Sequence, residues 1–344
     1  MDKDKVIKEL NEMNQKLARD LDKSQADLEL VESQTQYLRN DQTQKLIRDI
    51  ALLNNDFYMN RTDTQDKKLT LSKSFNNPNS LEKNDEHEFS RKHTLIHLKS
   101  NSICTWIPKN SCSSIRYSFA VANGAISNIN DIDWIHKNNY SFSANNKELL
   151  IANYAFVIVR NPFKRLLSYY CDKLCNTIGS SNDKSYDRAK SAMGSHSRTT
   201  FAEFVEILWK KPELKKADDH IRDQCDFLIY KNYNDYLPLE DYKRTTSTIR
   251  DRTGVSLEDV RPFNSIHTSY GCQDTEEIDY DSPSELIGTA MGNSQKPKPE
   301  NMYNPELIKK VGQLYLSDIM LYLKTVENGD KEMNYWLKHM HSHE

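Results

Sequence analysis

The stretch ICTWIPKNSCSSIR, from Ile103 to Arg116, decides how the rest of this chain is interpreted. It opens with an apolar run typical of a strand, which stops at Pro108. Polar residues follow from Lys109 to Ser114, and then apolar residues at helical spacing begin an amphipathic helix. A strand, a tight turn and a helix start together predict an anion site. The free N–H groups of the first helical turn point at the anion, and the helix dipole favours its charge.

The residues of this turn indicate how the anion would be held. Lys109 supplies a mobile cation. The main-chain N–H groups of five residues, with small hydroxyl side chains among them, supply hydrogen-bond donors: Asn110, Ser111, Cys112, Ser113 and Ser114. The stretch between Ser100 and Val121 contains no glycine. The GxxxxGK[ST] pattern is therefore missing, which argues against an ATP- or GTP-binding Walker loop.

A second stretch, AFVIVRNPFKRLLSYYCDKL (155–174), repeats the same pattern. An apolar strand ends at Arg160, Asn161 is placed to cap a helix, and Pro162 takes the first helical position. Ser168 lies two turns into this helix. Arginine is the side chain best shaped for a forked, charge-assisted grip on phosphate. Two such sites on one parallel sheet suit a ligand with phosphate groups at both ends.

Together the two stretches resemble the sulfotransferases that use 3′-phosphoadenosine 5′-phosphosulfate (PAPS). The likeness is greatest to the carbohydrate branch, with its Golgi chondroitin, dermatan and heparan 2-O enzymes and bacterial relatives. That family has a PKxxxxS loop, here 108–114, and a VRxPFxRLxSxY segment, here 159–170. The resemblance covers about residues 95 to 325. It implies that Lys109 and the 110–114 turn hold the 5′-phosphosulfate of PAPS, and that Arg160 and Ser168 hold the 3′-phosphate. Arg165 is expected to brace the loops.

The resemblance also implies the chemistry. Sulfonate transfer needs positioning, stabilisation of the charge on the leaving phosphate, and one base for the proton of the acceptor hydroxyl. Lys109 is expected to stabilise the leaving group, and no metal is required. The base is expected to be His136, because relatives carry a catalytic histidine between the two loops. His220, beside Asp218 and an adjacent aspartate, is the second candidate, and an acidic residue such as Asp133 is the third.

Composition narrows the class of protein. The 344 residues carry a net charge of −3, so there is no basic surplus for binding nucleic acid. The sequence shows no signal peptide and no run of about 18 apolar residues that would span a membrane. The six cysteines show no CxxC pairs, which is typical of reduced thiols. We therefore expect a cytoplasmic enzyme of bacterial or viral type.

Four regions are predicted along the chain. Residues 1–55 form a long helix, either a coiled coil that makes homo-oligomers or a helix packed on the domain. Residues 56–90 form a polar linker, residues 91–325 the sulfotransferase domain, and residues 326–344 a frayed C-terminal tail.

The fold class expected for the sulfotransferase domain is α/β, a three-layer sandwich around a mainly parallel sheet, similar to P-loop nucleotide-binding folds. Strands are predicted at 103–107, 155–159 and 226–230. Helices are predicted at 240–254 and from Asn304-Pro305 onward.

Three functions remain open at this level. The first is a sulfotransferase that transfers sulfonate from PAPS to a hydroxyl acceptor, a carbohydrate by resemblance. The second is a nucleotide-dependent, kinase-like phosphotransferase, and the third is an inactive sulfotransferase-like coiled-coil adaptor. The acceptor itself is not encoded in a readable pattern, because acceptor clefts are built from variable loops, here 176–199 and 271–300.

Overall fold

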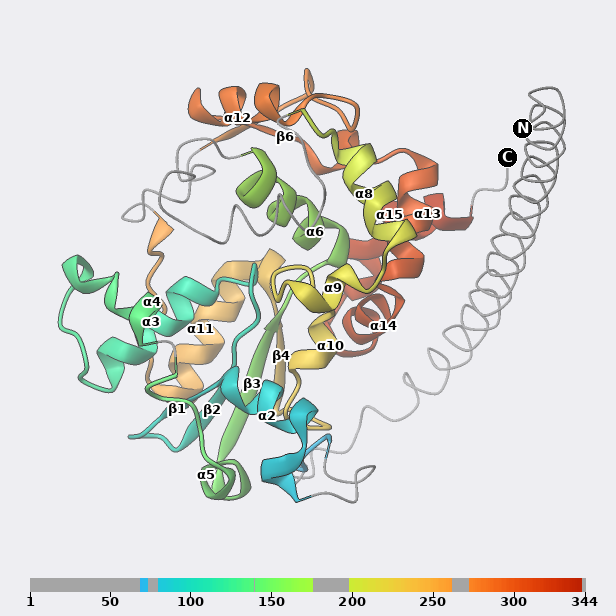
Figure 1. Ribbon diagram of the computed structural model, residues 1–344. Helices are drawn as coiled ribbons and strands as arrows, with labels where there is room; N and C mark the ends of the chain where they lie inside the picture. The colour runs from blue at the N-terminus through green and yellow to red at the C-terminus, as the bar shows by residue number, and fades with distance from the viewer. Residues whose placement is uncertain (1–68, 74–79, 139, 176–197, 262–271, 342–344) are drawn as a thin grey trace, which may run out of the picture. The chain divides into compact units, whose positions relative to one another are not determined.

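The structure is a computed structural model that describes residues 69–73, 80–138, 140–175, 198–261 and 272–341 (Figure 1). The predicted helix at 1–55 and most of the polar linker lie outside these residues. The strands are β1 Thr94–His97, β2 Ser102–Thr105, β3 Tyr154–Val159, β4 Asp235–Pro238, β5 Gln273–Thr275 and β6 Gln295–Pro297. The α-helices before residue 200 are α2 Asp85–Lys92, α3 Cys112–Ala122, α4 Trp134–Lys137, α5 Asn146–Ile151 and α6 Pro162–Tyr170. Those after it are α8 Phe201–Lys210, α9 Leu214–Ala217, α10 Gln224–Phe227, α11 Tyr242–Thr253, α12 Ser284–Gly292, α13 Pro305–Leu314, α14 Leu316–Thr325 and α15 Gly329–His341.

A four-stranded sheet in the order β1-β2-β3-β4 forms the centre of the described chain. β1 runs antiparallel to β2, whereas β2–β3 and β3–β4 are parallel pairs. The two strands predicted before the anion loops are therefore direct neighbours, with Ile103 opposite Ala155. Their carboxyl ends meet at one edge of the sheet, which is where open α/β sheets bind ligands. The predicted α/β class with a mainly parallel central sheet is confirmed.

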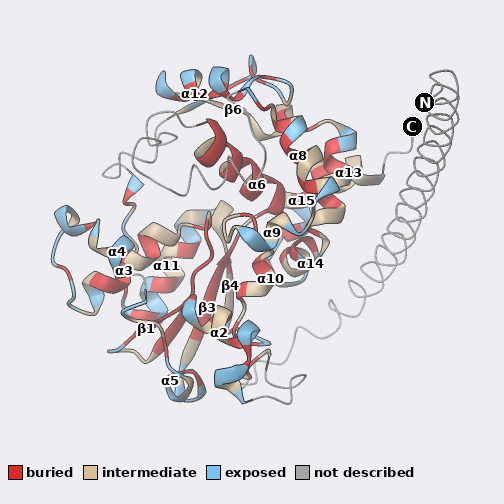
Figure 2. Ribbon diagram, viewed as in Figure 1, coloured by how far each residue is buried: buried red, intermediate tan, exposed pale blue. Residues whose placement is uncertain are grey.

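Apolar side chains pack on both faces of this sheet, and much of β3 is coloured as buried in Figure 2. Along β3, alternate residues face opposite sides, as the two-residue repeat of a strand requires. Val157 packs into a cluster with the helices α6, α8 and α13 to α15, and Phe156 packs into a second cluster with α3 and α11. A strand buried on both faces reads as an unbroken apolar run, which is why 155–159 was recognisable in the sequence.

The strand predicted at 226–230 is wrong. Residues 224–227 instead form the single turn α10, and the third parallel strand is β4, a few residues later. The apolar side chains that suggested a strand are buried by packing: Phe227 and Ile229 lie in the larger cluster. Tyr230 lies in no named strand and pairs by an isolated bridge with Leu71, in the segment expected to be a linker.

Three other segments are more ordered than expected. α2 begins inside the predicted linker, where Asn84 caps its first turn by accepting a hydrogen bond from His87. The polar region 271–300 forms β5, α12 and β6, with β5 and β6 paired in a small parallel sheet. Residues 329–341, expected to be a frayed tail, form α15, because Trp336 is 1% exposed and stacks on Phe163 with ring centroids 4.6 Å apart.

Candidate functional site

The loop between β2 and α3 turns through two residues with left-handed backbone conformations. The φ angle is 69° at Lys109 and 61° at Ser111. Residues with a side chain rarely adopt this region, which costs roughly 1–3 kcal/mol per residue and is concentrated at functional sites. The loop therefore makes its tight turn without the glycines of a Walker sequence.

The first turn of α3 has no side-chain cap among the described residues. Ser111 is the N-cap residue, yet its hydroxyl makes no capping hydrogen bond within the described part of the chain. Ser113 is half-buried and Ser114 is buried at this helix start. The N–H groups of an uncapped first turn, together with the helix dipole, form an anion-binding end.

Asn110 has a supporting role in this loop. Its main-chain N–H donates to the carbonyl of Ile107 at 3.1 Å, so this group is used within the turn. Its buried side chain donates to the carbonyl of Ile158 on β3 at 2.9 Å. Asn110 therefore ties the loop to the neighbouring strand, and its predicted contribution of an N–H to the anion stays a prediction.

The second loop is built as predicted. Asn161 caps α6, its Oδ1 accepting hydrogen bonds from the N–H groups of Phe163 at 3.0 Å and Lys164 at 3.4 Å. Pro162 takes the first helical position. Because Asn161 already occupies donors at the start of α6, an anion at this loop must be held mainly by side chains. Ser168 is half-buried on α6.

Arg160 joins the two loops. Its Nη1 donates to the carbonyl of Lys109 at 2.8 Å, which places the predicted 3′-phosphate arginine against the predicted 5′-phosphate loop. Burial lowers the pKa of Arg160 and Glu240 acts in the opposite direction, but a guanidinium remains charged in proteins. The contact with Lys109 uses one of its N–H donors and leaves others for a ligand.

Arg165 braces the site, as predicted. It is 2% exposed, and its Nε donates to the carbonyl of Pro108 at 3.1 Å. Its Nη1 donates to the carbonyl of Arg222 at 2.7 Å. One buried side chain on α6 thus holds the β2–α3 loop and brings a third segment, 218–224, to the same edge of the sheet.

This third segment carries His220, which Asp218 holds in place. Asp218 Oδ1 accepts a hydrogen bond from the His220 main-chain N–H at 2.9 Å and lies 2.8 Å from Nδ1 of its ring. Asp218 Oδ2 accepts one from the Tyr169 hydroxyl of α6 at 3.0 Å. With the Nδ1 proton directed at the carboxylate, the neutral ring carries its lone pair on Nε2. The pair is therefore arranged to accept a proton at Nε2.

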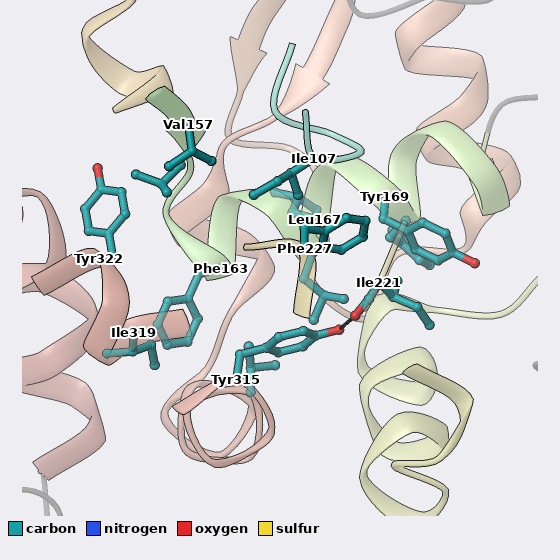
Figure 3. Close-up of a cluster of buried hydrophobic side chains, with 14 of the residues drawn as sticks. Ile107, Val157, Phe163, Leu167, Tyr169, Ile221, Phe227, Tyr315, Ile319 and Tyr322 are labelled. Carbon is teal, nitrogen blue, oxygen red and sulfur yellow. Dashed lines mark hydrogen bonds between the residues drawn. The ribbon is translucent and has the colours of Figure 1, made fainter. Parts of the chain in front are cut away.

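The core fixes the same segment from the other side. The Tyr315 hydroxyl donates to the carbonyl of Ile221 at 2.7 Å (Figure 3), and Ile221 is buried in the same hydrophobic cluster as Leu167 of α6. Tyr315 also separates α13 from α14, a region expected to be one helix.

His136 lies elsewhere in the fold. It is exposed on α4, a short helix whose buried Ile135 packs with Tyr117 and Ala120 of α3. In Figure 1, α4 lies at the left of the view and α6 at its upper centre, so the two helices are apart. The structure brings His220, but not the helix that carries His136, to the side of the second loop.

Asp172 is a neighbour of Lys109 that no sequence pattern predicted. Its Oδ2 lies 3.0 Å from Nζ of Lys109 and 3.6 Å from Nζ of Lys173, with its side chain 15% exposed. Asp172 belongs to a π-helical turn, Cys171–Cys175, that continues α6. Such turns often occur at functional sites. Asp172 therefore pairs with the lysine of the first loop and with a lysine of its own turn.

Asp218 should make stability depend on pH. Burial alone would raise the pKa of Asp218, but hydrogen bonds and charge from His220, with the Tyr169 hydroxyl, lower it from 3.8 to about 2. A lowered carboxyl pKa stabilises the fold above the unfolded pKa, and this contribution is lost as pH falls from about 4 to about 2. Asp218→Asn should therefore cost about 2 kcal/mol of unfolding free energy at neutral pH and less near pH 3.

Urea unfolding at both pH values measures this difference, with the exposed Asp281→Asn as control. A cost for Asp218→Asn that is the same at both pH values would contradict the assignment.

Comparison with protein families matches residues 44–324 to the sulfotransferase family. The match spans most of the chain, and the protein belongs to this family, whose members transfer sulfonate groups. Comparisons with curated proteins and with solved structures found no match. Among the described residues, no helix is both long enough and apolar enough to cross a membrane.

Proposed function

We propose that this sulfotransferase takes its sulfonate from PAPS and transfers it to the hydroxyl group of an acceptor, a carbohydrate by resemblance. The observation that carries the proposal is the hydrogen bond between Arg160 Nη1 and the Lys109 carbonyl. This bond links the two loops that are proposed to bind anions, at one edge of the sheet. A ligand with phosphate groups at both ends of a nucleoside can engage both loops at once.

The residues present fit this donor. The uncapped start of α3 and Lys109 suit the 5′-phosphosulfate. The capped start of α6 leaves Arg160 and Ser168 to hold the 3′-phosphate by their side chains. When bound, PAPS supplies an activated sulfonate and a stable phosphate leaving group. The uncapped helix start at the first loop thus matches the 5′-phosphosulfate, and the guanidinium at the second loop matches the 3′-phosphate.

The chain itself supplies charge and a base. Lys109 places a positive charge where the leaving phosphate gains negative charge, which lowers the barrier without any proton transfer. His220 accepts the proton of the acceptor hydroxyl at Nε2, and Asp218 fixes the tautomer and stabilises the resulting imidazolium. The proposal therefore assigns the base to His220, in place of the sequence-based preference for His136.

The acceptor is proposed only as a class. A sulfonate acceptor needs a hydroxyl that can reach Nε2 of His220, and a carbohydrate offers many. Incubation with radiolabelled PAPS and a panel of sugars, alcohols and tyrosine peptides, without Mg²⁺, would identify it. Transfer that requires Mg²⁺ and ATP in place of PAPS would support the kinase-like alternative.

Nucleotide binding tests the donor directly. We expect 3′,5′-ADP to raise the melting temperature of the protein clearly more than AMP at the same concentration, without Mg²⁺. Removing the 3′-phosphate leaves Arg160 without the anion that its site is built for. Equal shifts with both nucleotides would contradict the proposal.

Arg160→Ala should weaken binding of 3′,5′-ADP by about 10- to 100-fold, the effect of losing a charge-assisted hydrogen bond. AMP binding should change much less. Isothermal titration calorimetry measures both affinities. Arg250→Ala, which removes an arginine with a 62% exposed side chain from α11, is the matched control and should bind both nucleotides normally.

A further inference from the structure

One buried amide touches both anion-binding loops. Gln224, the first residue of α10, is fully buried. Its Oε1 accepts a hydrogen bond from Nδ2 of Asn110 in the first loop at 2.7 Å. The same oxygen accepts one from the main-chain N–H of Arg160 at 3.0 Å, and its Nε2 donates to the Arg160 carbonyl at 2.9 Å.

From these contacts we infer that Gln224 is a positioning residue that fixes the first anion loop relative to Arg160. This inference rests on the proposed function, because it assigns a task to loops that are proposed to hold the donor. Gln224 itself is enclosed behind the loops and acts through Asn110 and Arg160.

The hydrogen bonds allow only one orientation of the amide. The Arg160 main chain presents an N–H that must meet an acceptor and a carbonyl that must meet a donor. A flipped amide would place Nε2 against the N–H and Oε1 against the carbonyl, and both contacts would become repulsive. The Gln224 side chain therefore fixes the Arg160 main chain by two hydrogen bonds, one to its N–H and one to its carbonyl. A single hydrogen bond would leave the peptide free to rotate.

α14 holds Gln224 in place. Asp318, on α14, is fully buried, and its Oδ2 accepts a hydrogen bond from the Gln224 main-chain N–H at 2.8 Å. Its Oδ1 accepts one from the N–H of Cys225 at 3.1 Å. The carboxylate thereby caps the single turn α10 with charge-assisted bonds, which are stronger than neutral ones. Asp318 thus fixes the main chain of Gln224, and the Gln224 side chain extends from there to the loops.

Loss of the Gln224 side-chain amide should weaken binding of the 3′-phosphate more than binding of the 5′-phosphate. Without Gln224, Asn110 keeps its bond to the carbonyl of Ile158, so the first loop stays attached to β3. The Arg160 main chain loses both partners, and its guanidinium is then less well fixed. Binding of a ligand that needs both loops should suffer more than binding of a ligand that needs one.

The variants Gln224→Met and Gln224→Glu test this. Methionine keeps the volume but makes none of the three hydrogen bonds, whereas glutamate keeps the acceptor oxygen and replaces the donor to the Arg160 carbonyl with a second oxygen. Calorimetry should show that Gln224→Met lowers the ratio of 3′,5′-ADP affinity to AMP affinity by about 10-fold or more, and that Gln224→Glu, which loses the donor to the Arg160 carbonyl, also lowers it. A ratio unchanged from the unmutated protein would overturn the inference.

Asn123→Leu is the matched control, because it removes another amide that holds a main-chain N–H and a carbonyl. Asn123 accepts from the N–H of Leu98 at 3.0 Å and donates to the carbonyl of Ile96 at 2.8 Å. It lies at the end of α3 away from the loops, so it should change stability but not the ratio. If Gln224→Met does not fold, a ratio lowered in Gln224→Glu supports the inference and an unchanged one overturns it. Equal affinity for both nucleotides in the unmutated protein would instead contradict the proposed donor.

Discussion

Replacing His220 with alanine is expected to lower turnover by about 10²–10⁴-fold, with the affinity for 3′,5′-ADP almost unchanged. The reason is that His220 would accept a proton only as the acceptor hydroxyl attacks, so its loss affects the transition state and not the bound nucleotide. Turnover is measured with labelled PAPS and an acceptor found by screening. Nucleotide affinity is measured separately by calorimetry.

The turnover of His136→Ala, compared with that of His220→Ala, shows which histidine is the base. His136 is exposed on α4, so its loss should leave turnover within a few fold of normal. If His136→Ala abolished turnover and His220→Ala did not, the base would be His136, as relatives with a histidine between the loops suggest. Weakened nucleotide binding in His220→Ala would indicate a structural role in place of a catalytic one.

Lys109→Ala should lower turnover by about 10²–10³-fold and should also weaken binding of 3′,5′-ADP. On the proposed function its charge meets the 5′-phosphate both before reaction and in the transition state, so ground-state binding and rate should fall together. The same assays used for His220 distinguish the two roles: the base variant spares nucleotide affinity, whereas the lysine variant does not.

The control is Lys310→Ala, because Lys310 is also a mostly buried, ion-paired lysine, with Nζ 2.7 Å from Glu306 and 19% of its side chain exposed. It lies on α13, outside the loops, and should leave both turnover and nucleotide affinity near normal. Normal nucleotide affinity in Lys109→Ala would show that this lysine does not contact the 5′-phosphate.

Local chemistry made several elements readable from the sequence. Asn161 followed by Pro162 marks the start of α6 because one residue caps the helix and the other cannot donate. Gly254, with φ of 79°, ends α11 in the left-handed conformation that glycine adopts without strain. The strand predicted at 226–230 failed because burial there comes from tertiary packing. Distant partners such as Asp318 shape the backbone, and no local pattern reveals them.

Part of the candidate site was also predictable from local sequence, and part depended on contacts between distant residues. Lys109 and Arg160 follow buried strands, and their positions at one edge of the sheet follow from the parallel topology. The pairing of Lys109 with Asp172 and the role of Gln224 depend on side chains separated by tens of residues in the sequence. The choice between His136 and His220 likewise required the fold, because each histidine has a polar neighbourhood in the sequence.

Arg160 and Arg165 hold the first loop by its main chain, through the carbonyls of Lys109 and Pro108. A carbonyl is present whatever side chain a residue carries, so neither arginine depends on the lysine that it helps to place. The conformation of the loop and the side chain at position 109 can therefore change independently during evolution. On the proposed function, a lineage that lost Lys109 would lose turnover and keep the fold of the loop, and a single codon change could restore the lysine.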